Sequence, residues 1–238
     1  MSDETTPSVA ETYRRAGYEI PEHLGSAHDR HWPALGGPGD WLDGETRRRI
    51  IIETRNARNC ELCRRRSEAV SPNAVPGNHD ATTDLDPAMV DAVHRVSVDA
   101  KRLSRTFAEA AMAEMGPGPY VEMVGVVACT WLMDVFAWAL GVDEPGVPER
   151  RPGEPVGEIP EGTGDVGAWV PQELEKVRAN VTRALSYAPL TNGSWRGLVN
   201  EHYSRGEQFG HLVWDRALSR PQVELVAART AALNECFY

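Results

Sequence analysis

One apolar segment constrains the fold of this chain more than any other feature of the sequence. Residues 120–141 are apolar almost all round the helix that they are expected to form, so this helix should lie at the centre of the molecule. The segment contains Glu122 and Asp134, which favours a buried core helix over a membrane span. No run of alternating apolar and polar residues indicates a strand, and the expected fold class is therefore all-α.

The composition is that of a globular protein. Apolar residues make up 41% of the 238 positions, which argues against a largely disordered chain. The formal net charge is −10, from 25 basic and 35 acidic residues. An acidic chain is not expected to bind nucleic acid or an anionic membrane. The polar start of the chain has no apolar signal-peptide core, so a cytoplasmic location is expected.

Turn residues and changes in composition divide the chain into four expected segments. The first is an irregular arm rich in Gly, Pro and His, with a short helix expected at 8–16, and the second holds a helical half with a Cys-x-x-Cys motif. A Pro/Gly-rich linker and a second helical half follow. The segments cover residues 1–40, 41–141, 142–168 and 169–238.

Three helix starts can be placed, two of them from their capping residues, Asp86 and Ser219. Asp43 precedes one helix, Asp86 stands before a proline at the start of another, and Ser219 lies shortly before the proline of the last. Periodicity indicates two more helices, at about 171–187 and 194–205.

The strongest local motif is Cys60-x-x-Cys63. Two thiols at this spacing can close a small disulfide ring, so that one attacks a substrate and the other resolves the product. A helix N-terminus at the pair and the basic residues 64–66 would both favour a thiolate. Two alternatives stay open: inert thiols, or half of a zinc site, for which His79 and Cys129 are the nearest further ligands.

A second candidate site lies in the last helix, where Glu224 stands twelve positions before Cys236. Periodicity alone favours a plain interpretation, in which Glu224 is a first-turn carboxylate and Cys236 a small buried residue. When Cys60 is aligned with Cys236, Thr54 falls on Thr230, which indicates a weak internal repeat of two diverged helical halves.

The C-terminal segment resembles the active-site helix of the AhpD-like alkylhydroperoxidases, in the carboxymuconolactone decarboxylase-like superfamily. That family has Glu, eleven residues, Cys, two residues, Cys, three residues and His, and Glu224 and Cys236 match its first two positions. Residues 120–128, 139–142 and 218–229 are similar to flanking segments of the family. The resemblance covers about residues 85–238 and implies an AhpD-like helical bundle that forms homo-oligomers.

The chain stops one position before the second cysteine of that pattern would fall. A cloning boundary, a frameshift or an in-frame UGA codon could each explain this. We favour the last, with selenocysteine at position 239, because some AhpD-like proteins resemble this chain in carrying Cys-x-x-Sec. On this interpretation the final helix of the bundle is missing.

The first half departs from the family pattern. Arg48 stands twelve positions before Cys60 in place of Glu, and Ser67 stands four positions after Cys63 in place of His. Cys60 and Cys63 therefore resemble a copy that keeps the thiols and lacks the proton relay. The remaining candidates are expected to have no catalytic role: Cys129 is expected to be a buried free thiol, and His94, His202 and His211 to be surface residues. The alternative for His202 and His211 is proton transfer near the C-terminal site.

The resemblance implies a thiol- or selenol-dependent peroxidase or a related disulfide oxidoreductase, with Glu224, Cys236, Cys60 and Cys63 as catalytic residues. It needs no metal or organic cofactor, because the thiols store the electrons. The substrate of such an enzyme would be a peroxide. A thioredoxin- or lipoyl-type dithiol protein would then reduce the oxidised enzyme back to its thiol form. Lactone decarboxylation is disfavoured by the paired thiols, and the remaining alternative is a non-catalytic helical interaction protein.

Overall fold

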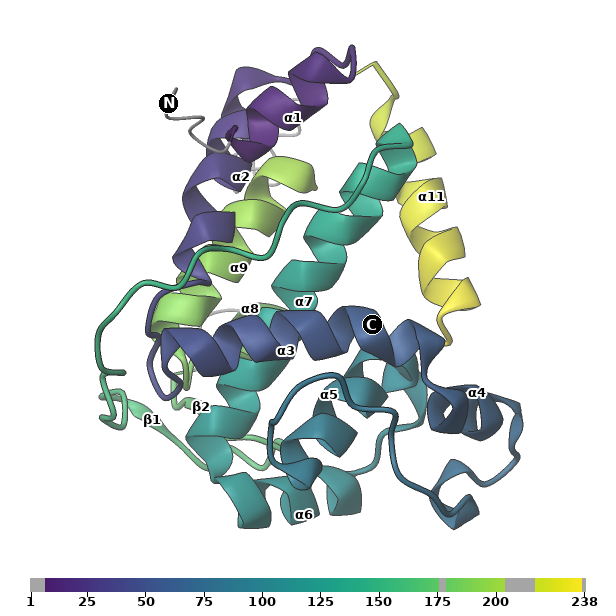
Figure 1. The fold of residues 1–238 in the computed structure, drawn as a ribbon, viewed down its shortest axis with the longest axis vertical. Helices are drawn as coiled ribbons and strands as arrows, with labels where there is room; N and C mark the ends of the chain where they lie inside the picture. The colour runs from purple at the N-terminus through teal and green to yellow at the C-terminus, as the bar shows by residue number, and fades with distance from the viewer. Residues whose placement is uncertain (1–6, 176–178, 204–216, 237–238) are drawn as a thin grey trace.

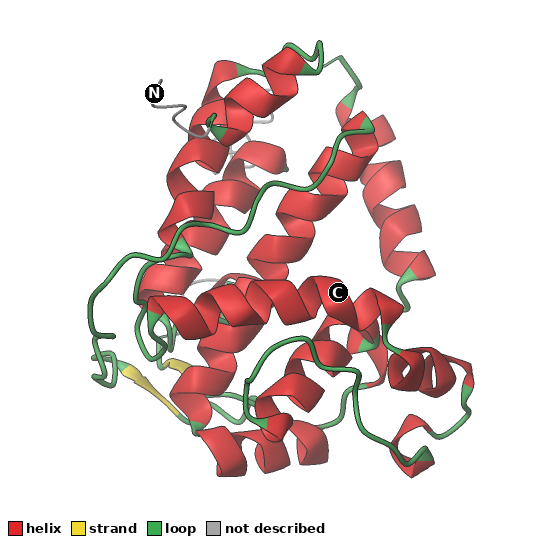
Figure 2. Ribbon diagram, viewed as in Figure 1, coloured by secondary structure: helices red, strands yellow, loops and turns green. Residues whose placement is uncertain are grey.

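The computed structural model describes residues 7–175, 179–203 and 217–236, and its regular structure there is almost entirely helical (Figure 1). One two-stranded antiparallel ribbon, β1 (Thr163–Gly164) with β2 (Gln172–Glu173), is the exception (Figure 2). The α-helices are α1 (Val9–Arg15), α2 (Glu22–Ala34), α3 (Gly44–Asn56), α4 (Glu61–Glu68), α5 (Pro87–Val98), α6 (Arg105–Met115), α7 (Pro117–Leu140), α8 (Asn180–Arg183), α9 (Pro189–His202) and α11 (Arg220–Leu233). Single 3₁₀ turns cover Ala57–Asn59, Pro72–Ala74 and Ala100–Arg102. The expected all-α class is confirmed.

Helix α7 is the central element, as its apolar sequence predicts. Helices α3, α5, α6 and α9 pack against it, and Met123, Val126, Cys129 and Met133 are fully buried along its length (Figure 1). Among the described residues it is the one helix that is long and apolar enough to cross a membrane, by length and composition alone. In this fold it forms the core.

The two acidic residues of α7 are accommodated by arginines of α3. The Glu122 carboxylate lies 3.2 Å from Nε of Arg47, and the Asp134 carboxylate lies 2.7 Å from a terminal nitrogen of Arg55. Burial of a carboxylate is tolerated when a cation and further hydrogen bonds compensate its charge. These ion pairs therefore hold α3 across α7.

The capping residues define the helix starts that the sequence predicts. The side chains of Asp43 and Asp86 accept hydrogen bonds from backbone amides in the first turns of α3 and α5. Ser219 forms a capping box with Gln222 at the start of α11. The helix that starts after Asp86 ends at Val98, and the 3₁₀ turn Ala100–Arg102 separates it from α6.

The short helix expected at 8–16 is confirmed as α1, but the prediction that the rest of the arm up to residue 40 is irregular is wrong, because α2 lies there. The segment contains α1 and α2, and α2 packs against both α1 and α9. Leu24, Ala27 and Trp32 of α2 are buried in these contacts. Tertiary burial outweighs the low helix propensity of the Gly, Pro and His residues, which obscured the apolar face in the sequence.

Residues 142–162 contain no helix, in agreement with the predicted linker. Hydrogen bonds hold this linker against α2 and α3: Gly146 accepts one from the Trp32 indole of α2, and the Pro148 carbonyl accepts one from Nε of Arg48 of α3. The helix predicted at 171–187 is wrong, because the described part of that stretch holds β2 and the four-residue α8. The helix predicted at 194–205 is α9, which begins earlier, at Pro189.

Helices α3 and α11 correspond position by position in the alignment that places Cys60 on Cys236. That offset of 176 residues places the cap Asp43 on the cap Ser219 and the first residue of α3 on the first residue of α11. Thr54 donates a hydrogen bond to the carbonyl four residues earlier, and Thr230 does the same. These shared features are local, and α3 has six buried residues whereas α11 has none, so the internal repeat stays a prediction.

Candidate thiol–imidazole site

The Cys-x-x-Cys motif lies at the start of α4. Helix α3 ends at Asn56, and the 3₁₀ turn Ala57–Asn59 separates it from α4. Cys60 then has extended backbone and is the N-cap of α4, and Cys63 is its third helical residue. Both cysteines are free thiols and are buried, with 1% and 6% of their surfaces exposed.

Two histidines from separate segments face these thiols. His79, from the loop between α4 and α5, places Nδ1 at 3.5 Å from both Cys60 Sγ and Cys63 Sγ. His94, from α5, places Nδ1 at 3.3 Å from Cys63 Sγ. The four donor atoms lie within 4.8 Å of one another. Two sulfurs and two imidazole nitrogens therefore converge on one small space.

Each histidine has a carboxylate behind it. His94 Nε2 lies 2.9 Å from a Glu53 carboxylate oxygen, and His79 Nε2 lies 2.9 Å from an Asp91 carboxylate oxygen. A carboxylate accepts a hydrogen bond, so each Nε2 carries the proton and each Nδ1 presents a lone pair to the thiols. The carboxylates thus set the tautomer in which the imidazoles can accept a proton or bind a metal.

The loop that carries His79 is attached to the helices on both sides of the motif. The Glu53 carboxylate accepts hydrogen bonds from the backbone amides of Thr82 and Thr83, at 2.7 and 2.6 Å. Asp80 accepts one at 2.9 Å from the backbone amide of Glu61, the first residue of α4. These bonds position His79 over the thiols without a regular element of its own.

Burial and hydrogen bonding shift the proton affinities of this site in opposite directions. Burial, followed by the neighbouring Cys60 thiol, raises the pKa of Cys63 to about 12. Burial also raises the pKa of Glu53, but hydrogen bonds led by His94 and Asn56 outweigh it and lower the pKa to about 2. Burial lowers the pKa of His94, against the opposing Glu53 hydrogen bond. The resting site therefore contains a neutral Cys63 thiol and an ionised Glu53.

The structure corrects two expectations about this site. His94 is not a surface residue, because it is fully buried on α5 against Cys63. The first half also does not lack histidine–carboxylate pairs, although Arg48 and Ser67 occupy the family's relay positions. The chain supplies such pairs from α3, α5 and the intervening loop.

The C-terminal candidates lie elsewhere. Glu224 is exposed in the second turn of α11, so it is not the first-turn carboxylate that the sequence suggests, and it lies 3.6 Å from Arg220. Cys236 is exposed three residues after the end of α11, not buried. At about 1.5 Å per helical residue the two are separated by roughly 15 Å or more along the helix. Their predicted catalytic roles stay a prediction.

The other sequence candidates take structural positions. Cys129 is a fully buried free thiol in the middle of α7, as expected, and burial raises its pKa to about 12. His202 is half-buried and stacks on His28, with 2.7 Å between their Nε2 atoms, so it is not a plain surface residue. His211 lies outside the described residues.

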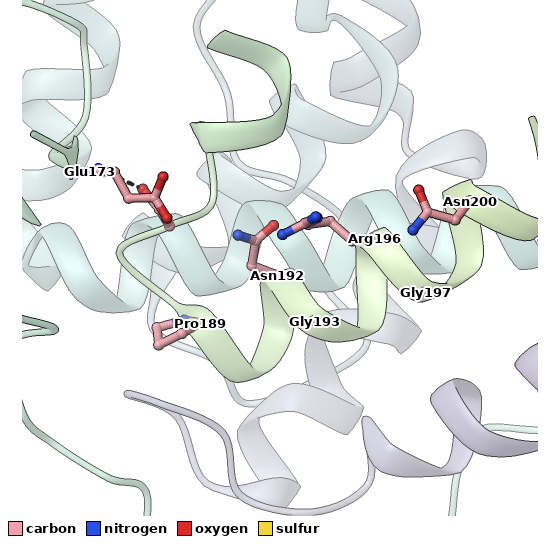
Figure 3. A pocket seen from close by; sticks show the side chains of 8 residues that line it. Glu173, Pro189, Asn192, Gly193, Arg196, Gly197 and Asn200 are labelled. Carbon is pink, nitrogen blue, oxygen red and sulfur yellow. Dashed lines mark hydrogen bonds between the residues drawn. The ribbon is translucent and has the colours of Figure 1, made fainter. Parts of the chain in front are cut away.

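A separate polar hollow of about 420 Å³ lies along α9 (Figure 3). Asn192, Arg196 and Asn200 line it at helical spacing, and Glu173 of β2 faces them across the opening. The Asn192 side-chain oxygen is buried there without a hydrogen-bond partner. None of the cysteines lines this hollow.

Comparison with known proteins identifies no relative. No family model, no curated protein and no solved structure matches this chain.

Proposed function

We propose that this protein is a thiol-dependent oxidoreductase of the peroxidase type, in which Cys63 is the reactive thiol and Cys60 resolves the product. The observation that carries the proposal is the connected series Cys63 Sγ, His94 Nδ1, His94 Nε2 and Glu53 carboxylate, with separations of 3.3 and 2.9 Å. A nucleophile beside a base that a third group orients is the general arrangement of nucleophilic catalysis.

His94 accounts for how a neutral thiol could react. In the first step, Nδ1 of His94 takes the proton of Cys63 while the sulfur attacks the outer oxygen of a hydroperoxide. The O–O bond breaks, the leaving alkoxide receives the proton as an alcohol, and Cys63 becomes a sulfenic acid. Glu53 stabilises the imidazolium that forms in between and keeps its orientation.

Cys60 completes the oxidation. Its sulfur attacks Cys63, water leaves, and a disulfide forms between the two. In total, two thiols and one hydroperoxide give one disulfide, one alcohol and one water. A dithiol protein would then reduce the disulfide by exchange, which requires the start of α4 to open because both sulfurs are buried in the folded chain. No organic cofactor takes part in the cycle.

Burial of the two thiols and of His94 limits the size of the hydroperoxide that can reach Cys63. Only 1% of Cys60 and 6% of Cys63 is exposed, and His94 is fully buried. A bulky lipid hydroperoxide could not place its oxygens beside Sγ of Cys63 in this arrangement. We therefore propose hydrogen peroxide or a slender alkyl hydroperoxide as the substrate class.

The AhpD-like resemblance supports the same chemistry. In that family the second cysteine of the motif reacts with the peroxide and the first resolves it, which corresponds to Cys63 and Cys60. The family's histidine follows the motif on the same helix, whereas here His94 of α5 would replace it. Membership of the family is part of this proposal.

The test follows the two thiols in reduced, metal-free protein treated with one equivalent of hydrogen peroxide. We expect a Cys60–Cys63 disulfide by peptide mass mapping. Cys60→Ser should instead accumulate a sulfenic acid on Cys63, detected by intact mass as one added oxygen. His94→Asn should slow oxidation of Cys63 by about 10²- to 10⁴-fold, the usual contribution of a general base.

Cys129→Ser and Cys236→Ser are the matched controls, since both cysteines lie outside the proposed site. Each should form the Cys60–Cys63 disulfide at the rate of the unmodified protein. If peroxide leaves both thiols reduced, or if oxidation is equally fast in folded His94→Asn, the proposal is wrong.

The surface of α11 favours a second role, as a contact between copies of this chain. Helix α11 has no buried residue, and Leu225, Val226 and Leu233 expose 72%, 59% and 63% of their surfaces. Exposed apolar surface of this kind is typical of an interaction site. We expect a homo-oligomer by light scattering, which Leu225→Glu should dissociate, while Glu224→Gln on the same helix should not.

A further inference from the structure

We infer that Cys60, Cys63, His79 and His94 together form a zinc site. The donor set is the first reason. Two thiolates and two imidazoles are among the common ligand sets of structural zinc, and thiolate ligands disfavour magnesium and calcium. All four residues are buried or nearly so, and their donor atoms lie within 4.8 Å of one another.

The distances match those of a zinc tetrahedron. With zinc–sulfur and zinc–nitrogen bonds of about 2.3 and 2.0–2.1 Å, neighbouring sulfur and nitrogen ligands are about 3.5–3.6 Å apart. The three sulfur–nitrogen separations that involve His79 and His94 are 3.5, 3.5 and 3.3 Å. The remaining pairs lie within 4.8 Å, so a shift of about 1 Å would complete the coordination.

The outer groups are those that a metal-binding histidine usually has. Glu53 and Asp91 each accept the Nε2 proton of one histidine, which leaves both Nδ1 lone pairs directed at the thiols. Asp91 is itself held by Arg66, whose guanidinium lies 2.7 Å from its carboxylate. Each of the two histidine ligands therefore has its own orienting carboxylate, Glu53 for His94 and Asp91 for His79.

The four protein ligands imply that the zinc ion would have a structural role and not a catalytic one. Four protein ligands satisfy tetrahedral zinc and leave no position for substrate. The ligands come from α4, the following loop and α5, so a bound ion would cross-link three segments that otherwise share a small apolar cluster around Cys60, Leu62 and Cys63. Binding would release the two thiol protons, and the two thiolates would neutralise the charge of the ion.

This inference goes beyond the proposed peroxidase and does not depend on it. Zinc needs only the reduced thiols and the two lone pairs, whereas the peroxidase also needs a hydroperoxide to reach Cys63. A bound ion would occupy both thiolates, so the zinc form and the peroxide-reactive form would exclude each other.

The test is a titration of the reduced full-length chain with Co²⁺ and then Zn²⁺, without peroxide. We expect one equivalent of Co²⁺ to give the visible absorption of a tetrahedral site and a near-ultraviolet thiolate-to-cobalt band. One equivalent of Zn²⁺ should remove both. The melting temperature should rise with Zn²⁺ and stay unchanged with Mg²⁺ or Ca²⁺.

Variants separate the ligands from the other cysteines. The thiolate band should persist in Cys129→Ser and Cys236→Ser and weaken in Cys60→Ser and in Cys63→Ser. Asp91→Asn should keep the spectrum and weaken zinc binding by about 10- to 100-fold, the usual effect of losing an orienting carboxylate.

Two results would overturn the inference. One is the absence of a thiolate band and of a Zn²⁺-dependent melting shift in the unmodified protein. The other is full retention of the band when Cys60 and Cys63 are both replaced. A zinc-binding chain that ignores peroxide would refute only the peroxidase, and a peroxide-reactive chain without zinc affinity would refute only the metal site.

Discussion

Glu53 and His94 are 41 positions apart in the sequence, yet Glu53 accepts a hydrogen bond from Nε2 of His94 at 2.9 Å, with both side chains fully buried. The bond joins the end of α3 to the middle of α5. It also fixes which nitrogen of His94 faces Cys63, so one contact serves both the packing of the helices and the chemistry of the thiol.

Replacement of Glu53 by Gln should destabilise the fold. The two Glu53 oxygens accept bonds from His94, Asn56, Thr82 and Thr83, and a glutamine would direct an amino group at some of these donors. We expect a loss of about 1–3 kcal/mol in the free energy of unfolding, measured by urea denaturation. Glu45→Gln, at a half-exposed position on the same helix, should cost less than about 1 kcal/mol.

Loss of Arg47, which pairs with Glu122, should lower the free energy of unfolding more than the Glu53 substitution does. Arg47→Met would leave a fully buried carboxylate without its cation, and breaking a buried ion pair on one side costs about 3–5 kcal/mol. Arg64→Met removes an exposed arginine that pairs with Glu61 and Glu68 and should cost less than about 1 kcal/mol. Equal denaturation midpoints for the two variants would contradict the burial of the Arg47 pair.

Acidification should weaken the fold through His28. Burial, followed by the neighbouring His202, lowers the pKa of His28 to about 3. A histidine that is harder to protonate when folded binds fewer protons than in the unfolded chain. The free energy of unfolding should therefore fall below about pH 6.5, by up to about 1.4 kcal/mol per pH unit.

His28→Leu is the comparison for this effect. Urea denaturation between pH 7 and pH 5 should give a shallower decline in the variant, because the leucine does not titrate. Parallel declines in the two proteins would show that His28 is not the group responsible.

Two glycines on neighbouring helices should respond in opposite directions to alanine. A Cβ at Gly125 of α7 would lie 2.6 Å from the Thr191 methyl carbon, whereas a Cβ at Gly193 of α9 meets no atom within 4 Å. We expect Gly125→Ala to lower the melting temperature, at a cost of about 1–3 kcal/mol. Gly193→Ala should raise it, with a gain of about 0.4–1 kcal/mol from the helix backbone.

Thiol reactivity should distinguish the four cysteines. Cys236 is exposed, while Cys60, Cys63 and Cys129 are buried. Titration of the reduced native protein with a chromogenic disulfide should show one fast equivalent, and the other three should react on unfolding. The fast equivalent should be absent in Cys236→Ser; two or more fast thiols would contradict the burial of the motif.

The helices with clear capping residues could be predicted from the sequence. Asp43, Asp86 and Ser219 each precede the helix that they cap, because a short acceptor side chain before a helical run is a local signal. Helix α2 could not be found in this way, since Pro21 provides no side-chain cap and its apolar face depends on contacts with α9.

The candidate site was predicted in part. The spacing of Cys60 and Cys63 identified the thiols, and His79 was already a possible ligand. His94 was missed, although its position four residues after buried Val90 places both on one face of α5. Glu53 lies three residues after buried Ile50 and so shares a face of α3 with it, but only the folded chain shows that its carboxylate meets an imidazole from another helix.

The thiol–imidazole site has a consequence for the order of biosynthesis. Its thiols, imidazoles and orienting carboxylates all lie between Glu53 and His94, so every bond in it joins parts of one short stretch of chain. Contacts between residues close in sequence form with little loop-closure entropy. This stretch can therefore come together while α7 and α9 are still being synthesised on the ribosome, and zinc or an oxidant could meet the nascent chain before its core exists.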